Sequence, residues 1–514
     1  MKHIVICCDG TGNEYGDANS NVIKLYRSLQ QDRNQVATYY HPGVGTMGDK
    51  SALTEIGKVW TQFRGLAFGY GLSENIADAY CYLMRTFEPD DRIYIFGFSR
   101  GAYTARALCG LLQMFGLLAP GIEGQIPYAI RLFKRRDGGL FSGLRARTNK
   151  FEIARGFKST FCRDCKPYFL GLWDTVSSVG WILDPIGLKP GGLPYTRSLG
   201  DITVVRHALA IDERRAFFRQ NLVQEQSGRD IKQVWFAGVH SDVGGSYPEA
   251  ESGLSKISLS WMVREAQGAG LVFDQAALDR VLGRDAAHAL ALPNAMIHNS
   301  LTAPWWLGEV WPKFTKRRVS APGASPEKFK GSPRLNLFRR RFIAEGARIH
   351  SSVFTRKTLL PGYLPSNLPQ KVTLEPDLDT VAYPMRLNVG DTKLVAIFAR
   401  AKWNDTTIEV HQDETYDLQA WGTWYDASIS CGPDGYTSPS AGFRFVERLR
   451  RYPGANWFGL IGSVGRDGAA SFVVGSSKTT RIRTSGVLYF YANDLPFLYK
   501  NNSGSLKLKI TRTS

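Results

Sequence analysis

The stretch "FGFSRGA" at residues 96–102 contains a serine whose setting suits nucleophilic chemistry. Ser99 is the centre of a Gly-x-Ser-x-Gly pattern that joins a buried-strand pattern at 92–98 to a helical pattern at 100–116. At such a strand-to-helix turn, the serine hydroxyl projects from the sheet and can attack an acyl carbonyl. An ordinary tight turn is the alternative, and the strand and helix on either side favour the nucleophile.

A serine nucleophile needs a base, and the base needs a carboxylate that orients it. Asp174 ends the apolar run 167–174, and His240 ends the run 232–240, so both fall at predicted carboxyl ends of strands. Sites of open parallel sheets form at that edge. Ser99, Asp174 and His240 also follow the chain order of an α/β-hydrolase triad, so we predict them as nucleophile, orienting acid and base.

Other residues remain open for these roles. His298 in "MIHNSL" is the main alternative base, and Asp242, two residues after the candidate base, is the alternative acid. His207 lies in 205–218, which we predict as a helix, where a structural role is favoured. His350 lies beyond the main sheet pattern.

Backbone N–H groups beside the turn would stabilise the oxyanion that forms during acyl transfer. Arg100 begins the predicted helix, whose first turn carries N–H groups and the positive end of the dipole. A second donor would come from "DGTGN" at 9–13, where the N–H of Gly10 or Thr11 would point at the oxyanion. A phosphate-binding turn is a weak alternative because neither phosphate-loop glycine pattern is present. This chemistry needs no cofactor.

Strand-like and helix-like segments alternate through the first part of this 514-residue chain, which is long enough for two or three domains. The predicted strands are 3–7, 37–40, 92–98, 167–174 and 232–240, and the predicted helices are 21–30, 71–87, 100–116, 205–218 and 254–270. This alternation predicts an α/β domain over 1–372, with a mostly parallel sheet and helices on both faces. Short alternating runs between turn residues predict an all-β sandwich over 373–514.

Positive charge is in excess and concentrated. The chain has 64 Lys and Arg against 46 Asp and Glu, and the segment 311–350 has 11 basic residues against two Glu. A basic balance suits an anionic partner, either nucleic acid or a membrane surface. We see no nucleic-acid motif and expect no such partner. Contact of 311–350 with anionic lipid and a merely solvated loop both remain open.

The cysteines and the N-terminus indicate the cellular compartment in which the protein is made. Seven scattered cysteines imply no disulfide framework. Cys162-x-x-Cys165 would be half a zinc site or a redox pair, but no second CxxC accompanies it. The apolar part of the N-terminus is too short for a signal peptide, and no apolar run is long enough to span a membrane. We expect synthesis in the cytoplasm, with any export independent of a signal peptide.

An ordered set of motifs identifies a resemblance over about residues 1–370. The motifs are "CCDGTGN", "HPGVGT", "FGFSRGAYTAR", "LWDTVSSVG", "RHALAIDERR", "VWFAGVHSDVGGSY", "MIHNSL" and "GYLPSNLP". Together they resemble the α/β-hydrolase family of Tle-type phospholipase effectors of bacterial type VI secretion. The resemblance implies an α/β-hydrolase-like fold and hydrolysis of acyl esters of glycerophospholipids, with the matching Ser99, Asp174 and His240 as the triad.

The same resemblance implies a biological setting. The protein would be an antibacterial toxin that is secreted to act on the envelope of a target cell, with a phospholipid membrane as its substrate. An immunity protein and a component of the secretion apparatus would be its protein partners.

Near the C-terminus, "YANDLPFLYKNNSGSLKLKI" at 491–510 crowds Asn and Asp at short spacing. Hard oxygen ligands in one loop suit calcium, although the run does not match an EF-hand loop. An Asn-rich β-turn is the alternative. The run, together with "WFGLIGSVG" at 457–465, resembles the calcium-dependent galactophilic bacterial lectins of the PA-I type over about 380–514.

The lectin resemblance implies a Ca²⁺ site and a carbohydrate ligand. The side chains of Asp494, Asn501 and Asn502 would bind Ca²⁺, and the carbonyls of Leu498 and Tyr425 would complete the shell. Asp494 and Asn501 would also contact the sugar. The stretch "GPDGYTSPSAG" lacks the His and Gln with which those lectins contact galactose, so the kind of carbohydrate, lipopolysaccharide included, remains open.

These features predict a serine esterase of the phospholipase type with a calcium-dependent sugar-binding domain at its C-terminus. The alternative is a carbohydrate-binding adhesion protein that uses the hydrolase fold only as a scaffold. The intact order of serine, acid and histidine argues for the enzyme.

Overall fold

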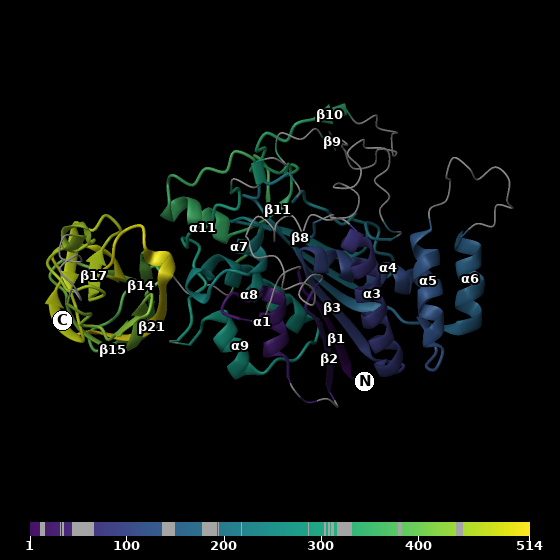
Figure 1. Ribbon diagram of the computed structural model, residues 1–514, viewed down its shortest axis with the longest axis horizontal. Helices are drawn as coiled ribbons and strands as arrows, with labels where there is room; N and C mark the ends of the chain where they lie inside the picture. The colour runs from purple at the N-terminus through teal and green to yellow at the C-terminus, as the bar shows by residue number, and fades with distance from the viewer. Residues whose placement is uncertain are drawn as a thin grey trace. The chain divides into compact units, whose positions relative to one another are not determined.

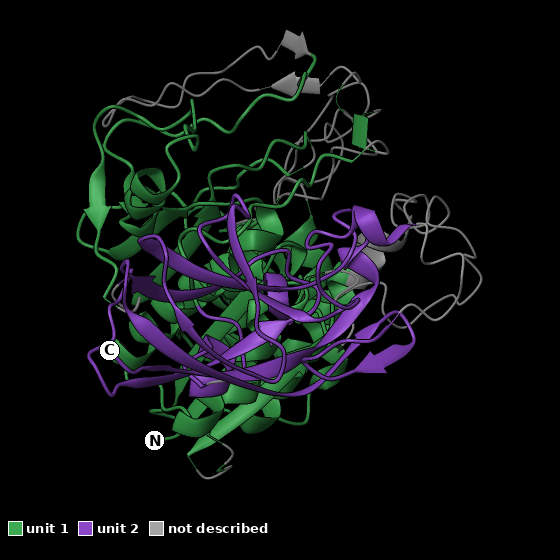
Figure 2. Ribbon diagram, turned by 90° about the vertical axis from the view of Figure 1, so that its left-hand side faces the viewer, with its two compact units in different colours: residues 1–248, 252–278, 291–379 green, residues 249–251, 279–290, 380–514 purple. Residues whose placement is uncertain are grey.

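The structure is a computed structural model of the chain. It describes residues 1–10, 16–30, 32, 35–43, 66–135, 150–176, 193, 195–216, 218–285, 287–302, 305–306, 309, 313–315, 332–378, 383–437 and 446–514. The chain divides into two compact units (Figure 2). Unit 1 comprises Met1–Pro248, Ser252–Leu278 and Ala291–Asp379, and unit 2 comprises Glu249–Glu251, Asp279–Leu290 and Thr380–Ser514. The main change from one to the other therefore falls a few residues after the predicted 372.

In its described residues, unit 1 contains an eight-stranded sheet with the order β12-β11-β8-β7-β6-β3-β1-β2. Figure 1 labels five of these strands, β1, β2, β3, β8 and β11. The strands are β1 His3–Cys8, β2 Val36–His41, β3 Arg92–Phe98, β6 Pro167–Trp173, β7 Val204–Ala210, β8 Asp230–Phe236, β11 Arg348–His350 and β12 Thr373–Glu375. Neighbouring strands run parallel throughout. The predicted parallel α/β architecture is confirmed.

Helices cover both faces of this sheet, because alternate strand residues point to opposite sides. Ile93 and Ile95 belong to the apolar core shared with α3 and α4. Between them, Tyr94 points to the other face, where its hydroxyl donates to the carbonyl of Ala269, one residue beyond α8 (2.8 Å). The helices of unit 1 are α1 Asn21–Ser28, α3 Leu66–Thr86, α4 Arg100–Phe115, α5 Ile126–Lys134, α6 Lys150–Phe161, α7 His240–Gly244, α8 Gly253–Gly268 and α11 Ser352–Leu359.

Several short elements complete the list. In unit 1 they are the paired strands β4 Leu117–Leu118 and β5 Cys162–Arg163, the paired strands β9 Lys313–Thr315 and β10 Ser332–Arg334, and the 3-10 turn η1 Glu123–Gln125. The 3-10 turn η3 Glu249–Glu251 belongs to unit 2, and α9 Gln275–Leu282 has residues in both units. Among the helices that the structure describes, none combines the length and the apolar character that crossing a bilayer requires.

Two predicted elements were wrong. The stretch 205–218 is not a helix, because its first half forms β7, which lies fully buried between β6 and β8. Its Ala, Leu and Arg residues favour helix, but burial on both faces overrides that local preference. The strand predicted at 232–240 ends at Phe236, and His240 instead begins α7. The sequence also did not predict β11 and β12, which extend the sheet at one edge.

The winding of the sheet reverses between β1 and β3. From β1 the chain passes to β2 on one side, whereas β3 lies on the other side and begins the series that leads to β12. Loops that follow two such strands diverge, which leaves a crevice at their carboxyl ends. Asp9 follows β1 and Ser99 follows β3, so the candidate nucleophile lies at this point.

The described residues of unit 2 form two antiparallel sheets. One has the order β13-β21-β15-β16, with β19 also paired to β15, and the other has the order β14-β20-β17-β18. Leu418 and Leu506 of the first sheet share one apolar core with Leu488 and Phe490 of the second, which confirms the predicted all-β sandwich. The strands are β13 Thr392–Phe398, β14 Asn404–Val410, β15 Thr415–Asp426, β16 Ile429–Cys431, β17 Leu460–Val464, β18 Ala470–Val473, β19 Ser477–Arg481, β20 Gly486–Ala492 and β21 Asn502–Arg512, with 3-10 turns η4 Glu447–Leu449 and η5 Tyr499–Asn501.

Candidate functional site

The turn that carries Ser99 is tight and strained. Ser99 has φ 58° and ψ −119°, a conformation that costs a non-glycine residue free energy, and its N–H donates to the carbonyl of Trp173 (3.0 Å). A Cβ atom at Gly97 would lie 2.6 Å from the carbonyl oxygen of Gly101, and one at Gly101 would lie 2.1 Å from that of Cys8. Both glycines are therefore needed where β3 turns into α4 against the end of β1.

The three predicted triad residues lie in hydrogen-bond contact. His240 Nε2 is 2.8 Å from Ser99 Oγ, and His240 Nδ1 is 2.5 Å from Asp174 Oδ2. Ser99 is 8% exposed, His240 is 4% exposed and Asp174 is fully buried. This is the arrangement in which a histidine can take the serine proton while a carboxylate fixes the ring orientation.

Aromatic rings and one backbone bond hold the imidazole of His240. The ring of Phe98 lies 4.7 Å from it on one side, and the ring of Phe218 meets it edge-on at 4.8 Å. The His240 N–H donates to Glu213 Oε2 (3.2 Å) at the start of α7. Arg215 pairs with the same carboxylate (2.9 Å) and lies over the Phe218 ring at 3.5 Å. The imidazole is thus fixed by packing as well as by its two polar partners.

A buried arginine holds the acid of the triad. Asp174 follows β6 with φ 41°, and its Oδ1 accepts the N–H of Ala210 (3.0 Å). Arg341 donates from Nη1 to Oδ1 (2.5 Å) and from Nη2 to Oδ2 (2.9 Å). Oδ2 of Asp174 therefore serves both Arg341 and His240.

These charges set the protonation states of the site. Burial opposes ionisation of Asp174, but Arg341 and His240 outweigh it and hold the pKa of Asp174 well below its usual value. Burial lowers the pKa of His240 below its ordinary 6.5, against the pull of Asp174. Glu213 is also buried, yet Arg215 and Arg341 lower its pKa to about 2. An ionised acid and a neutral base are the states that nucleophile activation requires.

Of the predicted oxyanion donors, the Arg100 N–H lies next to Ser99, whereas the Gly10 N–H already has a partner. Arg100 begins α4 directly after Ser99, where its N–H belongs to the first turn. The N–H of Gly10 instead donates to Asp9 Oδ1 (2.6 Å), because that carboxylate folds over its own turn. Asp9 Oδ2 accepts the hydroxyls of Ser20 (2.5 Å) and Tyr40 (2.9 Å), so this carboxylate joins the end of β1 to Ser20 and to β2. Thr11 lies outside the described residues.

The alternative base and acid form a pair of their own. His298 Nδ1 lies 2.6 Å from Asp242 Oδ1, and the His298 ring stacks on Tyr247 with centroids 3.5 Å apart. Asp242 Oδ2 also accepts the N–H of Val239 (3.0 Å), just before the candidate base at the start of α7. This pair stands beside the Ser99 site and supplies none of its three members.

His207 and His350, the other histidines weighed from the sequence, have structural contacts. His207 lies in β7, where its Nε2 accepts the N–H of Thr175 (3.2 Å), and burial lowers its pKa to about 3. His350 ends β11, its ring stacks on Phe236 at 4.7 Å, and its Nδ1 lies 2.8 Å from Ser352 Oγ. The prediction that His350 lies beyond the main sheet was therefore wrong.

The cysteine pair has no metal-site partners in the part of the chain that the structure describes. No group of three or more His, Cys, Asp or Glu side chains there is arranged to hold a metal ion. Burial raises the pKa of Cys162 to about 11 and that of Cys165 to about 12. Thiols held protonated in this way are poor nucleophiles and poor redox groups.

Part of the basic segment 311–350 points inward. Arg340 pairs with Asp212 (2.9 Å), and Arg341 is 1% exposed on the triad acid. Of the run 339–341, Arg339 remains exposed. The predicted surface role therefore does not apply to Arg340 and Arg341, whose carboxylate partners come from distant parts of the chain. Residues 311–312 and 316–331 lie outside the described part.

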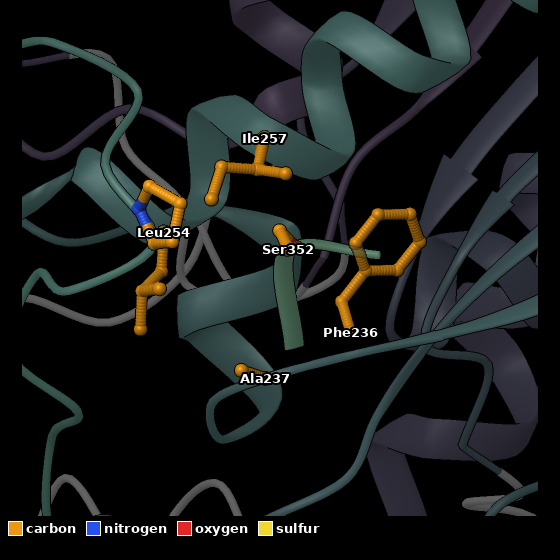
Figure 3. A pocket seen from close by; sticks show the side chains of 6 residues that line it. Phe236, Ala237, Leu254, Ile257 and Ser352 are labelled. Atoms are coloured by element: carbon orange, nitrogen blue, oxygen red, sulfur yellow. The ribbon is translucent and has the colours of Figure 1, made fainter. Parts of the chain in front are cut away.

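A small hollow lies elsewhere in unit 1 (Figure 3). Its empty volume is about 180 Å³, counting space open to solvent, and its lining consists of Phe236, Ala237, Leu254, Ile257, Pro293 and Ser352. None of the triad residues lines it. The candidate site is thus identified by its chemistry and not by this hollow.

In unit 2, the residues implied by the lectin resemblance gather around the start of β21. Asp494 is 1% exposed, and its Oδ2 accepts the Nδ2 of Asn502 (3.0 Å). Asn501 Nδ2 donates to Asp426 Oδ1 (3.2 Å) at the end of β15. Burial, together with the nearby Asp426 carboxylate, raises the pKa of Asp494. The buried Oδ1 of Asn502 accepts no hydrogen bond from the described residues.

This set of groups fits a hard cation. A buried amide oxygen without a donor and two carboxylates that repel each other would all be satisfied by Ca²⁺. The carbonyl of Leu498 accepts the N–H of Asn501 (3.1 Å) beside them, and Tyr425 precedes Asp426 on β15. The sequence missed Asp426, because it lies far from 491–510 along the chain and no spacing rule joins the two.

A curated protein is similar to part of the chain. The chain is 35% identical to "Uncharacterized protein YEL023C" of Saccharomyces cerevisiae over 232 residues, which are 43% of this chain and 32% of the yeast protein. The chain thus spans about a third of the length of that curated relative.

Two solved structures are similar over parts of the chain. A Tle1 effector bound to the VgrG spike of the type 6 secretion system is 21% identical, with a TM-score of 0.26, over 49% of this chain and 52% of that one. A PllA-like lectin, the EclA N-terminal domain, is 16% identical, with a TM-score of 0.19, over 23% of this chain and 94% of that one. Similarities of this size leave function to be argued from the residues.

A match to a protein family covers the candidate site. The family described as "T6SS, Phospholipase effector Tle1-like, catalytic domain" matches residues 2–265, just over half of the chain, which include Ser99, Asp174 and His240. The chain therefore belongs to the Tle1-like family of type VI secretion phospholipase effectors through its catalytic domain.

Proposed function

We propose that the chain is a serine esterase that hydrolyses acyl ester bonds of glycerophospholipids. The observation that carries the proposal is the unbroken relay from Ser99 Oγ through His240 to Asp174, with contacts of 2.8 and 2.5 Å. Membership of a phospholipase effector family supports the lipid ester as substrate.

The geometry suggests how the reaction proceeds. His240 Nε2 takes the proton from Ser99 Oγ as that oxygen attacks the acyl carbon, while Asp174 holds Nδ1–H and stabilises the imidazolium. The N–H of Arg100 and a group from the loop after β1 bind the oxyanion, each such donor contributing about 3 kcal/mol.

Collapse of this intermediate releases the lysophospholipid, whose alkoxide oxygen takes the proton from His240. Water then gives a proton to His240 and attacks the acyl-enzyme. The fatty acid leaves when Ser99 Oγ regains that proton. The complete cycle returns the triad to its starting state, so no cofactor is consumed.

The C-terminal unit would bind Ca²⁺ and, through it, a carbohydrate. The side chains of Asp494, Asn501 and Asn502 and the carbonyls of Leu498 and Tyr425 would hold the ion, which would supply a positive centre for vicinal sugar hydroxyls. Asp494 and Asn501 would also contact the sugar. The buried, unpartnered Oδ1 of Asn502 supports this part of the proposal.

The biological role would be that of a secreted antibacterial effector acting on the envelope of a target cell. Family membership supports this role, and the Tle1 structure bound to a VgrG spike supports a spike protein as the partner during export. An immunity protein would protect the producing cell from the same activity.

Hydrolysis of phosphatidylethanolamine and phosphatidylglycerol vesicles tests the proposal. Wild-type protein should release fatty acid and lysophospholipid, and Ser99→Ala should release none above the buffer rate. If the wild type cleaves neither a phospholipid nor a short acyl ester, the esterase proposal fails and the adhesion alternative takes its place.

A further inference from the structure

Arg341 is the most completely engaged cation near the candidate site. All five N–H groups of its guanidinium donate. Nη1 reaches Asp174 Oδ1 (2.5 Å) and the Ala210 carbonyl (3.1 Å), whereas Nη2 reaches Asp174 Oδ2 (2.9 Å) and the Phe218 carbonyl (2.5 Å). Nε donates to the same Phe218 carbonyl (3.1 Å). A side chain that is 1% exposed with every donor used is held in one position.

These bonds tie three parts of the site together. Asp174 follows β6, Ala210 ends β7, and Phe218 lies in the loop beyond it, with its ring edge-on to His240 at 4.8 Å. One guanidinium thus fixes the acid of the triad and the backbone of a residue that packs against its base. A planar fork suits this task because it matches both oxygens of a carboxylate at once.

Arg341 also changes the electrostatics of the relay. Asp174 Oδ2 receives both Arg341 Nη2 and His240 Nδ1, so a protonated imidazole shares its counter-ion with a permanent cation. A nearby cation disfavours a second positive charge.

Other charged groups also face His240. Glu213 accepts its backbone N–H and favours the imidazolium, while Arg215, which is paired with Glu213, opposes it. On α7 itself, Asp242 is engaged by His298. Arg341 is set apart from these groups because it binds the carboxylate that His240 uses.

We propose that Arg341 is a positioning residue of the triad, which holds the Asp174 carboxylate in the plane that His240 needs and weakens His240 as a base, so that His240 stays neutral and active to lower pH. This inference rests on the proposed esterase function. It assigns to the segment after β10 a role inside the reaction.

The test compares three variants of the full chain on a water-soluble short-chain acyl ester, so that membrane binding does not enter. Arg341→Met removes both the charge and the planar guanidinium that binds the two Asp174 oxygens. Arg341→Lys keeps the charge but lacks the guanidinium. Arg339→Met removes one charge from the same run at an exposed position and serves as the matched control. The pH dependence of kcat/KM is measured for each, since its acid limb reports the base of the free enzyme.

Arg341→Met should lower kcat by about 10- to 100-fold through misplacement of the acid. Its acid midpoint should rise by roughly one pH unit because one cation near the relay is gone. Arg341→Lys should lose kcat while its midpoint stays near that of the wild type. Arg339→Met should match the wild type in both. An unchanged midpoint in Arg341→Met, or a shift of the same size in the lysine variant, would overturn the proposal.

Two further measurements keep the proposal testable. If Arg341→Met does not fold, the lysine variant decides: a wild-type kcat there contradicts the positioning role. If the wild type hydrolyses no acyl ester, the proposed esterase function fails instead. The downfield proton signal of the Asp174–His240 bond still tests Arg341 in that case, because its titration midpoint should be lower in the wild type than in Arg341→Met.

Discussion

The two candidate sites differ in how many of their polar groups have hydrogen-bond or ion-pair partners within the chain. In unit 1, Ser99, His240 and Asp174 are paired with one another, and the acid also has Arg341 and the Ala210 N–H as partners. In unit 2, burial and then the nearby Asp426 carboxylate raise the pKa of Asp494, and the buried Oδ1 of Asn502 accepts no hydrogen bond in the described part.

The difference indicates that the groups of the Ser99 triad are paired before substrate binds, whereas those around Asp494 would be paired only when a cation binds. A catalytic relay works through protons already held in the protein, so its polar groups should be paired before substrate arrives. A cation site collects oxygens that repel each other until the ion is bound. We therefore expect the two units to respond differently to the loss of a carboxylate and to the removal of calcium.

The largest expected loss of activity follows from breaking the contact between Asp174 and His240. Asp174→Asn should lower kcat by about ten-thousandfold, because the amide favours the wrong tautomer of His240. Ester hydrolysis measures this loss. Asp242→Asn is the matched control, since it alters the neighbouring histidine–aspartate pair, and its loss should be far smaller. Equal losses in the two variants would contradict the assignment of the acid.

The next effect concerns the cation. Asp494→Asn should weaken calcium binding to the full chain by roughly a hundredfold, since it removes one of the charged oxygens that set affinity. Calorimetry with calcium alone measures the change. Asp417→Asn, which alters a half-buried carboxylate on β15 that accepts from Gln419 and Thr479, should leave binding unchanged. Chelation of calcium should not affect short-ester hydrolysis, and a calcium-dependent kcat would contradict the separation of the two sites.

A third prediction concerns the turn that presents the nucleophile. Gly101→Ala would place a Cβ 2.1 Å from the Cys8 carbonyl, so α4 must move away from β1. The free energy of unfolding should fall by about 1–3 kcal/mol, and Ser99 should lose its alignment with His240. Chemical denaturation measures the first effect and ester hydrolysis the second. An alanine variant of wild-type stability and activity would show that the close approach is not needed.

The smallest predicted effect is a shift of the acid side of the kcat/KM profile to lower pH. Only neutral His240 can accept the serine proton, so activity is lost as pH falls through the pKa of His240. Burial lowers that pKa below the ordinary 6.5. The profile of kcat/KM should therefore reach half its maximum below pH 6.5 on the acid side. A midpoint above that value would mean that Asp174 outweighs burial.

Local patterns were sufficient to predict the framework of the site. The strand before Ser99 and the helix after it were predicted from the periodicity and turn residues of short segments. The three triad residues were predicted from their order along the chain. The strand β7 was misjudged, because its residues favour helix and only burial between two neighbours makes them extended.

The partners of the site residues could not be predicted from one sequence. Arg341 lies 167 residues from Asp174 along the chain, inside a run of basic residues that resembled surface. Asp426 lies 75 residues from Asn501. Gly10 was predicted as a donor, but the adjacent Asp9 carboxylate takes its N–H. These contacts depend on how distant strands are placed, which periodicity does not encode.

Covalent labelling tests whether Ser99 is an activated nucleophile. The wild-type chain is treated with an alkyl fluorophosphonate, which reacts with activated serines, and the modified peptide is identified by mass spectrometry. We expect one phosphonylated residue, Ser99, with labelling lost in His240→Ala and vesicle phospholipid hydrolysis lost in proportion to labelling. Labelling of another serine, or hydrolysis that survives complete modification of Ser99, would contradict it.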